Sequence, residues 1–197
     1  MMSRVVHFLG SRITDLVAQK LDGLLRDKRG MGAVEFAILV PILLVTYIGV
    51  FELTVGFSTA KRVTRSVGAI ADFVTQKPTT SDDELSDMIH VARSYIAPYK
   101  TDGITIKING VAIDSARSAT IAWSWADGTT KSVVGDAVAV PEPILKAESY
   151  LVQVEVSIPH ELLMFMPTIA WQSKTFPITR TNFFSPRIGT SVICADC

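Results

Sequence analysis

The chain has 197 residues, 48% of them hydrophobic, and its formal net charge at pH 7 is zero. This length accommodates one membrane segment and one globular domain with its own core, and it argues against two independent domains. Residues 1–30 hold six Lys or Arg against three Asp or Glu, whereas residues 31–197 hold thirteen against sixteen. No arginine-rich stripe with interleaved aromatic residues is present, so nucleic acid is not an expected partner.

Residues 1–25 form a basic, amphipathic segment. Apolar residues recur there at helical spacing, with Arg4, Arg12 and Lys20 between them. Two interpretations stay open: a leader that lies on the inner membrane surface or is recognised by a partner, and an inert pre-sequence. The basic leader predicts a cytoplasmic N-terminus, although Lys61 and Arg62 beyond the apolar stretch weaken that argument.

An uncharged apolar run extends from Phe36 to Phe51. At 1.5 Å per residue it reaches only about 24 Å, short of the ~30 Å hydrocarbon core of a bilayer. We therefore expect the membrane helix to continue to Ala60, which gives a leader of residues 1–30, a span of 31–60 and an outer domain of 61–197. The competing interpretations are a core helix of a soluble protein and a secretory signal cleaved after Ala60, which would need an unusually long basic region before its apolar part.

The apolar pattern of this helix continues on one face beyond the span, until Lys77-Pro78 ends it. One helix is therefore predicted from about Ala33 to about Thr75, with its inner half in lipid, its outer half against the domain, and a bend at Pro41. A capping box at Ser81–Glu84 then begins a second, amphipathic helix that ends before Pro98.

After the second helix, the apolar period changes to two, which is typical of half-buried strands. Strands are predicted at Ile104–Ile108, Ile121–Trp125 and Val152–Ile158, and a weaker one at Ser173–Arg180, where Pro177 favours an edge. Asn109-Gly110 predicts a hairpin turn between the first strand and Val111–Ile113. The expected fold class is α+β: a long N-terminal helix whose inner half is transmembrane, a second short helix, and an antiparallel sheet.

Residues for catalysis or for binding a cofactor are not evident. His7, His90 and His160 are scattered over the leader, a helix and a loop, and none lies near Ser or Cys in a nucleophile pattern. We expect no enzyme activity, no cofactor and no metal. A pocket that joined His160 to a carboxylate would instead favour a periplasmic enzyme.

Cys194 and Cys197 end the sequence. Two cysteines do not complete a four-ligand zinc site, and no helix follows the first to lower its pKa as in a redox dithiol. Outside the cytoplasm an intrachain disulfide is favoured over an intermolecular one. Because the loop is so short, its stabilising effect should be small.

The segment Gly30-Met31-Gly32-Ala33-Val34-Glu35-Phe36, followed by an apolar helix with Pro41, resembles the processing motif of type IV pilin-like proteins. Its form, a glycine, four residues, then glutamate and an aromatic residue, is similar to that of the tight-adherence (Flp) type IVb pilus. Gly49–Leu53 and Gly56-Phe57 resemble the second acidic patch of TadE-like pseudopilins. The resemblance covers residues 26–70.

This resemblance implies that a prepilin peptidase on the cytoplasmic face cuts between Gly30 and Met31. It also implies that Glu35, Phe36 and Glu52 dock subunits, Glu35 by pairing with the terminal amine of a neighbour. The implied partners are other pilins or pseudopilins, the inner-membrane assembly platform and membrane lipid. For Glu35, a helix N-terminus that favours an acid is a simpler alternative, and Glu52 can also be an interfacial acid.

Two features separate the chain from the main subunits of such fibres. Phe36 replaces their common tyrosine, and the chain is far longer. The expected function is therefore that of a minor pseudopilin in pilus assembly or initiation, with a periplasmic C-terminal domain. The alternative is an uncleaved single-pass protein of the inner membrane whose outer domain binds a ligand or a partner.

Overall fold

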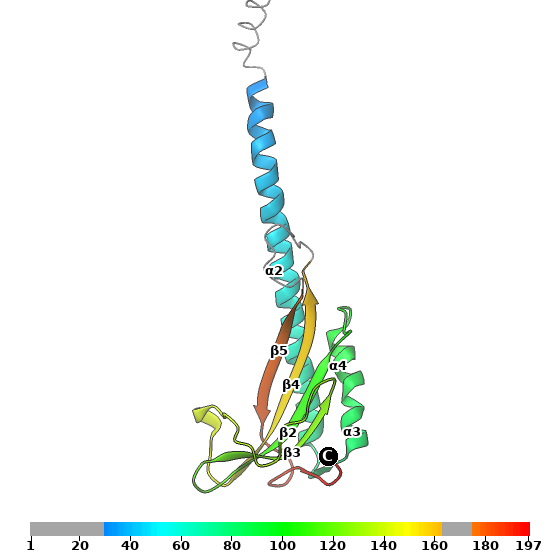
Figure 1. The fold of residues 1–197 in the computed structure, drawn as a ribbon, viewed down its shortest axis with the longest axis vertical. Helices are drawn as coiled ribbons and strands as arrows, with labels where there is room; N and C mark the ends of the chain where they lie inside the picture. The colour runs from blue at the N-terminus through cyan, green and yellow to red at the C-terminus, as the bar shows by residue number, and fades with distance from the viewer. Residues whose placement is uncertain (1–29, 163–174) are drawn as a thin grey trace, which may run out of the picture. The chain divides into compact units, whose positions relative to one another are not determined.

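The computed structural model describes residues 30–162 and 175–197, and the leader predicted in residues 1–25 lies outside them. The chain divides into two units between Val50 and Phe51. Figure 1 shows the elements, which follow in chain order: α2 (Met31–Thr75), β1 (Thr79–Thr80), α3 (Asp82–Ser86), α4 (Met88–Ile96), β2 (Thr105–Ile113), β3 (Ala119–Asp127), the 3-10 turn η2 (Glu142–Ile144), β4 (Ser149–Glu161), β5 (Thr175–Phe184) and β6 (Ile193–Cys194).

Helix α2 confirms the predicted long helix and continues through Pro41. In its N-terminal part the large apolar side chains are exposed, at fractions between 47% and 70%; they are Met31, Val34, Phe36, Ile38, Leu39, Ile42, Leu43, Leu44, Val45, Tyr47, Val50 and Phe51. Among the described residues, α2 alone is long and apolar enough to cross a membrane. Apolar residues on every side are what a helix surrounded by lipid requires.

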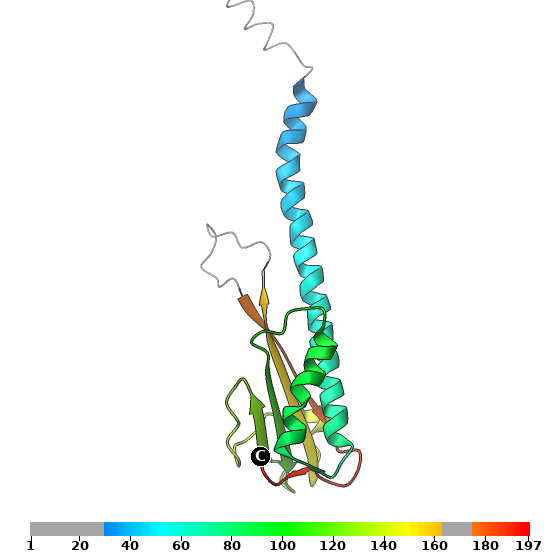
Figure 2. The same cartoon turned by 90° about the vertical axis from the view of Figure 1, so that its right-hand side faces the viewer.

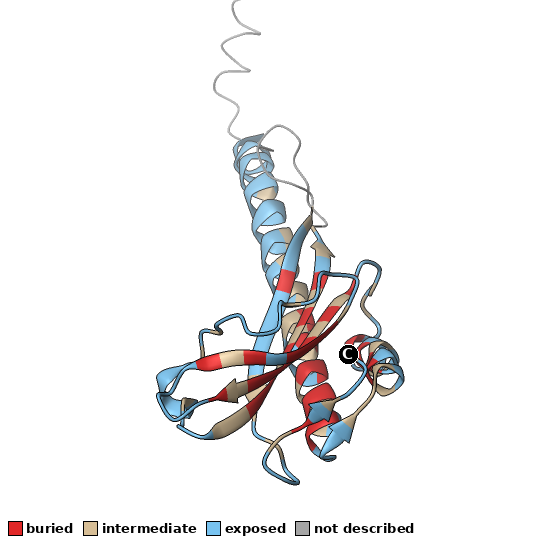
Figure 3. Ribbon diagram, turned by 60° about the horizontal axis from the view of Figure 1, so that its bottom comes forward, coloured by how far each residue is buried: buried red, intermediate tan, exposed pale blue. Residues whose placement is uncertain are grey.

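The C-terminal part of α2 is amphipathic and belongs to the core of the domain. Figure 3 shows buried residues along this part of the helix, which are Thr59, Val63, Ser66, Val67, Ile70, Ala71, Val74 and Thr75. The buried apolar ones share one cluster with residues of α4, β2, β3 and β4. The change from an all-apolar surface to a single apolar stripe therefore marks where the domain core begins.

The second predicted helix is divided into α3 and α4 by Asp87. Ser81 caps α3 as predicted, because its Oγ accepts a hydrogen bond from the Glu84 amide at 3.4 Å. The carboxylate of Glu84 binds Lys77 at 2.6 Å, which lowers the pKa of Glu84. In Figure 2, α3, α4 and the C-terminal part of α2 lie on the same side of the sheet.

The main sheet is antiparallel, with the strand order β3-β2-β4-β5. This arrangement confirms the predicted α+β order and places Pro177 in an edge strand, where its missing N–H is tolerated. The predicted hairpin at Asn109-Gly110 is wrong, because β2 runs straight through both residues. The β2–β3 turn lies at 114–118 instead, where Asp114 Oδ1 accepts the Ser118 amide at 2.8 Å.

Packing around Gly110 explains why the Asn-Gly pair forms no turn. Asn109 is buried, and its Nδ2 donates to Gln153 Oε1 at 2.8 Å. A Cβ atom at Gly110 would overlap the Tyr150 hydroxyl and the Trp123 indole. Glycine is thus required for close packing of two aromatic side chains on the strand, and not for a left-handed turn.

A β-bulge in β3 changes which side chains of the strand lie on each face of the sheet. Gly110 pairs with Trp123 and Val111 pairs with Ile121, which leaves Ala122 as an extra residue. Trp123 therefore joins the helix-facing cluster, whereas Ile121 joins a second cluster with Val111, Ile113, Ala119 and Leu151. The strand pattern predicted Ile121 and Trp123 on the same face, and the bulge corrects that prediction.

Candidate functional site: the N-terminal motif, the Glu52–His160 pair and the C-terminal tail

The predicted processing motif lies where α2 begins. Gly30 directly precedes the helix, and Met31 is its first residue. A Cβ built at Gly30 or at Gly32 meets no other atom within 4 Å. The glycines are therefore not required for packing in the described structure, and a cut after Gly30 would leave an intact helix that begins with a free amine.

Met31 and Glu35 are four residues apart in α2. Residues at this spacing are neighbours on one face of a helix. A new α-amine on Met31 and the carboxylate of Glu35 would therefore lie on the same face at the positive end of the helix dipole. Phe36 is 66% exposed beside them. The motif thus presents one acid, one potential ammonium group and one aromatic ring on the surface of the helix.

Glu52 contacts a residue of its own chain. Its Oε1 lies 3.6 Å from Nε2 of His160 on β4, and the two side chains are 15% and 11% exposed. The His160 ring also packs edge-on against Phe176 of β5, with ring centroids 5.1 Å apart. The structure therefore places Glu52 beside His160, a histidine that belongs to no catalytic pattern in the sequence.

A mostly apolar cleft of about 510 Å³ adjoins this pair. We call it the α2–β5 cleft, because most of its lining comes from residues 52–60 of α2 and 176–180 of β5. The structure therefore contains a pocket that joins His160 to a carboxylate, the feature that would favour an enzyme. No sequence signal pointed to it, because Glu52 and His160 are far apart in the chain and meet only where α2 packs against the sheet.

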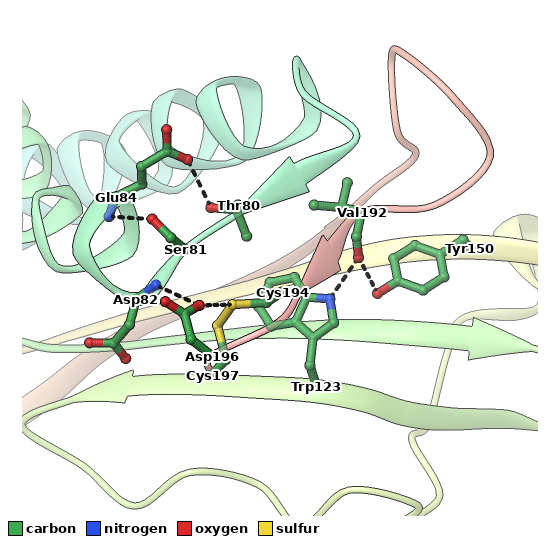
Figure 4. Close-up of a disulfide and its surroundings, with 10 residues drawn as sticks. All are labelled: Thr80, Ser81, Asp82, Glu84, Trp123, Tyr150, Val192, Cys194, Asp196 and Cys197. Carbon is green, nitrogen blue, oxygen red and sulfur yellow. Dashed lines mark hydrogen bonds between the residues drawn. A yellow bond between two sulfur atoms is a disulfide. The ribbon is translucent and has the colours of Figure 1, made fainter.

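The C-terminal tail, residues 192–197, contacts β1 and side chains of β3 and β4 (Figure 4). Strand β6 pairs in parallel with β1, an element that the sequence analysis missed. The Val192 carbonyl accepts hydrogen bonds from Trp123 Nε1 at 2.7 Å and from the Tyr150 hydroxyl at 2.9 Å. Burial raises the pKa of Tyr150 to about 12, which keeps its hydroxyl protonated as a donor.

Cys194 and Cys197 form a disulfide, with their Cα atoms 5.7 Å apart. Next to it, Asp196 Oδ1 accepts the Asp82 amide at the start of α3, at 3.1 Å. The two sulfur atoms and Asp196 lie close enough together to hold a metal ion, but cysteines in a disulfide offer no thiolate ligand. The arrangement therefore fastens the tail to the α2–α3 connection.

Comparison with known proteins finds a similarity in the N-terminal part of the chain. Residues 30–72 match the family model described as TadE-like protein. A search of curated proteins gave no match, and neither did a search of solved structures. The matched range begins at Gly30 and includes Glu35, Phe36 and Glu52, which confirms the resemblance inferred from the motif. Residues 30–72 of this chain are therefore a TadE-like segment.

Proposed function

We propose that this protein is a minor pseudopilin that acts in assembly or initiation of a tight-adherence (Flp) pilus. In this proposal residues 1–30 are a cytoplasmic leader, residues 31–60 span the inner membrane, and residues 61–197 form a periplasmic domain. The observation that carries the proposal is the TadE-like match over residues 30–72, which begins at the glycine of the motif. The apolar, exposed start of α2 supports the membrane span.

The proposed mechanism depends on the cut between Gly30 and Met31 by a prepilin peptidase. The cut removes the basic leader and creates the amine that Glu35 needs. An isolated carboxylate in an apolar environment is costly, and a nearby ammonium group offsets part of that cost. Because each processed chain carries both groups on one helix face, neighbouring pilins or pseudopilins can exchange pairs, which favours lateral docking of helices at the assembly platform.

Replacing Glu35 tests the docking step. We expect Glu35→Val to enter the membrane at least as well as the original chain, because an uncharged side chain is cheaper in lipid. It should nevertheless fail to co-purify with its pseudopilin partners after mild detergent extraction. Ile38→Val is the matched control, since Ile38 is an exposed apolar residue on the next turn. Equal co-purification of Glu35→Val and the control would contradict the pairing role.

One observation favours a second function. The Glu52–His160 pair beside a cleft has two groups of a hydrolytic site, a carboxylate and a candidate general base. Such a site also needs a nucleophile bonded to the imidazole. In the described part of the chain Nε2 of His160 faces Glu52 instead, so we favour a structural pair and a protein without catalytic activity.

A fluorophosphonate probe separates the two functions. It labels activated hydroxyl groups, so a hydrolase should react and should lose its label in His160→Ala. A structural pair predicts no His160-dependent label. Glu161→Ala, a change at the next residue of β4, is the control for non-specific effects.

A further inference from the structure

The α2–β5 cleft has different chemistry at its two ends. Leu53 and Phe57 of α2 are 63% and 68% exposed and give one wall an apolar surface. On β5, side chains alternate between the faces of the sheet, so Phe176, Ile178 and Arg180 share the face that lines the cleft. The strand begins at Thr175, so the aromatic ring is near its start and the guanidinium is farther into the domain.

Arg180 is the one Lys or Arg among the described residues that line the cleft. Its Nη1 donates to the Thr179 carbonyl at 2.9 Å. A guanidinium carries five N–H donors in a planar fork, so this bond leaves it able to bind a phosphate group with two parallel hydrogen bonds. The acid in the lining, Glu52, lies against His160.

The cleft begins where the apolar run ends. Under the proposed function, on which this step rests, α2 crosses the bilayer from its N-terminal end. A hydrocarbon core of ~30 Å takes about 20 helical residues, so a core that begins at Phe36 ends near Val55. Residues 52–60 therefore include the outer end of the hydrocarbon core and the interface beyond it, and the apolar wall of the cleft continues the lipid-facing surface of the helix.

We propose that the α2–β5 cleft binds one phospholipid of the surrounding bilayer. An acyl chain lies along Leu53, Phe57 and Phe176, and the phosphate group is held by Arg180. Three observations support this occupant: the continuity of the wall with the membrane span, the basic group at the opposite end, and a volume of about 510 Å³. That volume is within the ~300–1,000 Å³ typical of small-ligand sites, so the cleft holds one acyl chain and the phosphate group while the rest of the lipid stays in the bilayer.

Gly56 allows a direct test. It lines the cleft, and a Cβ built there meets no other atom within 4 Å. Gly56→Trp should therefore fill the cleft without disturbing the core, and Arg180→Gln should remove the phosphate contact. Arg187→Gln is the matched control, because Arg187 pairs with Asp72 at 2.5 Å.

The experiment is native mass spectrometry of the full chain after detergent extraction from membranes and extensive detergent washing. We expect a species with one bound phospholipid for the original chain and for Arg187→Gln, and loss of that species in Gly56→Trp and in Arg180→Gln. Absence of bound lipid in the original chain, or equal retention in all four proteins, would overturn the proposal. Circular dichroism of each variant verifies that the fold is kept.

A second measurement identifies any other occupant. A photoreactive benzoylphenylalanine at position 176 should give an adduct with the mass of a phospholipid, and this adduct should be lost in Gly56→Trp. A crosslink to residues 163–174 of the same chain, to a second copy or to another protein would overturn the lipid assignment. Failure of the proposed function is distinguishable: without a membrane span the chain would be missing from the membrane fraction before any lipid is measured, and without cleavage the bound-lipid species would carry the mass of the full-length chain.

Discussion

The two halves of α2 share one helical backbone but have opposite side-chain environments. In the first half, Phe36 and Leu43 are 66% and 62% exposed, whereas Val63, Val67 and Ile70 in the second half are completely buried. The first half is apolar on every side, and the second half keeps its charged residues, such as Arg65, on the exposed side. The comparison shows that the distribution of apolar residues around a helix, more than their number, separates a surface for lipid from a surface for a protein core.

Truncating one large apolar residue in each half of α2 should give the largest difference between the two halves. Ile70→Ala should lower the free energy of unfolding of the domain by about 2–5 kcal/mol, because it leaves a cavity in a closed core. Leu43→Ala, the matched control, should leave it unchanged. Fluorescence of the buried Trp123 and Trp125 reports denaturant unfolding of the full chain in detergent. Equal losses in the two variants would contradict the assignment of the halves.

Adding a lysine to each half of α2 tests the same difference through membrane insertion. Leu43→Lys should disfavour membrane insertion by about 2.5–3.5 kcal/mol, the cost of a cation near the centre of an inserted helix. Thr64→Lys, on the exposed side of the second half, should insert as well as the original chain. A translocon insertion assay measures both variants. Efficient insertion of Leu43→Lys would mean that residues 36–51 do not form the span.

Glycines in the protein core and on the exposed half of α2 should differ in their tolerance of an added methyl group. Gly110→Ala should lower the free energy of unfolding by about 1–3 kcal/mol, because the added methyl group displaces Trp123 and Tyr150. A Cβ at Gly49, in the exposed half of α2, meets no atom within 4 Å, so Gly49→Ala should cause no loss. The same unfolding measurement applies. An unchanged free energy of unfolding in Gly110→Ala would refute the packing explanation for the uninterrupted strand.

The smallest expected effect concerns the Lys77–Glu84 ion pair, which is exposed to water. Lys77 lowers the folded-state pKa of Glu84, so the pair stabilises the fold above the unfolded-state pKa of Glu84 and is lost as the pH falls through its folded value. Glu84→Gln should cost less than about 1 kcal/mol at neutral pH. The cost should vanish in acid, and Lys77→Gln should cause a similar loss that does not add to it. An acid-independent, additive loss would exclude the pairing.

Local sequence signals predicted the helices and strands well. Lys77-Pro78 marked the end of α2 within a few residues, Ser81 marked the start of α3, and alternating valines marked β4. Each of these signals acts within one element, so it can be read from neighbouring residues. The α+β order follows from them.

The errors occurred where distant residues decide the structure. Asn109-Gly110 has the composition of a turn, but packing of Trp123 and Tyr150 across Gly110 keeps the strand straight. The Ala122 bulge, the β1–β6 pairing and the contact of Glu52 with His160 also join segments far apart in the chain. A single sequence carries no signal of such contacts. For Glu52, the sequence identified an acid at the end of the span but not the imidazole that it meets.

Glu35 has an ammonium group to pair with only if the mature chain begins at Met31. Intact mass and N-terminal sequencing of the chain extracted from membranes test it directly. We expect loss of residues 1–30 and a free N-terminal Met31 for the original chain, with the full-length form retained in Gly30→Ala. A membrane-extracted chain that still begins at Met1 would rule out the pairing of Glu35 with a terminal amine and favour the uncleaved single-pass protein.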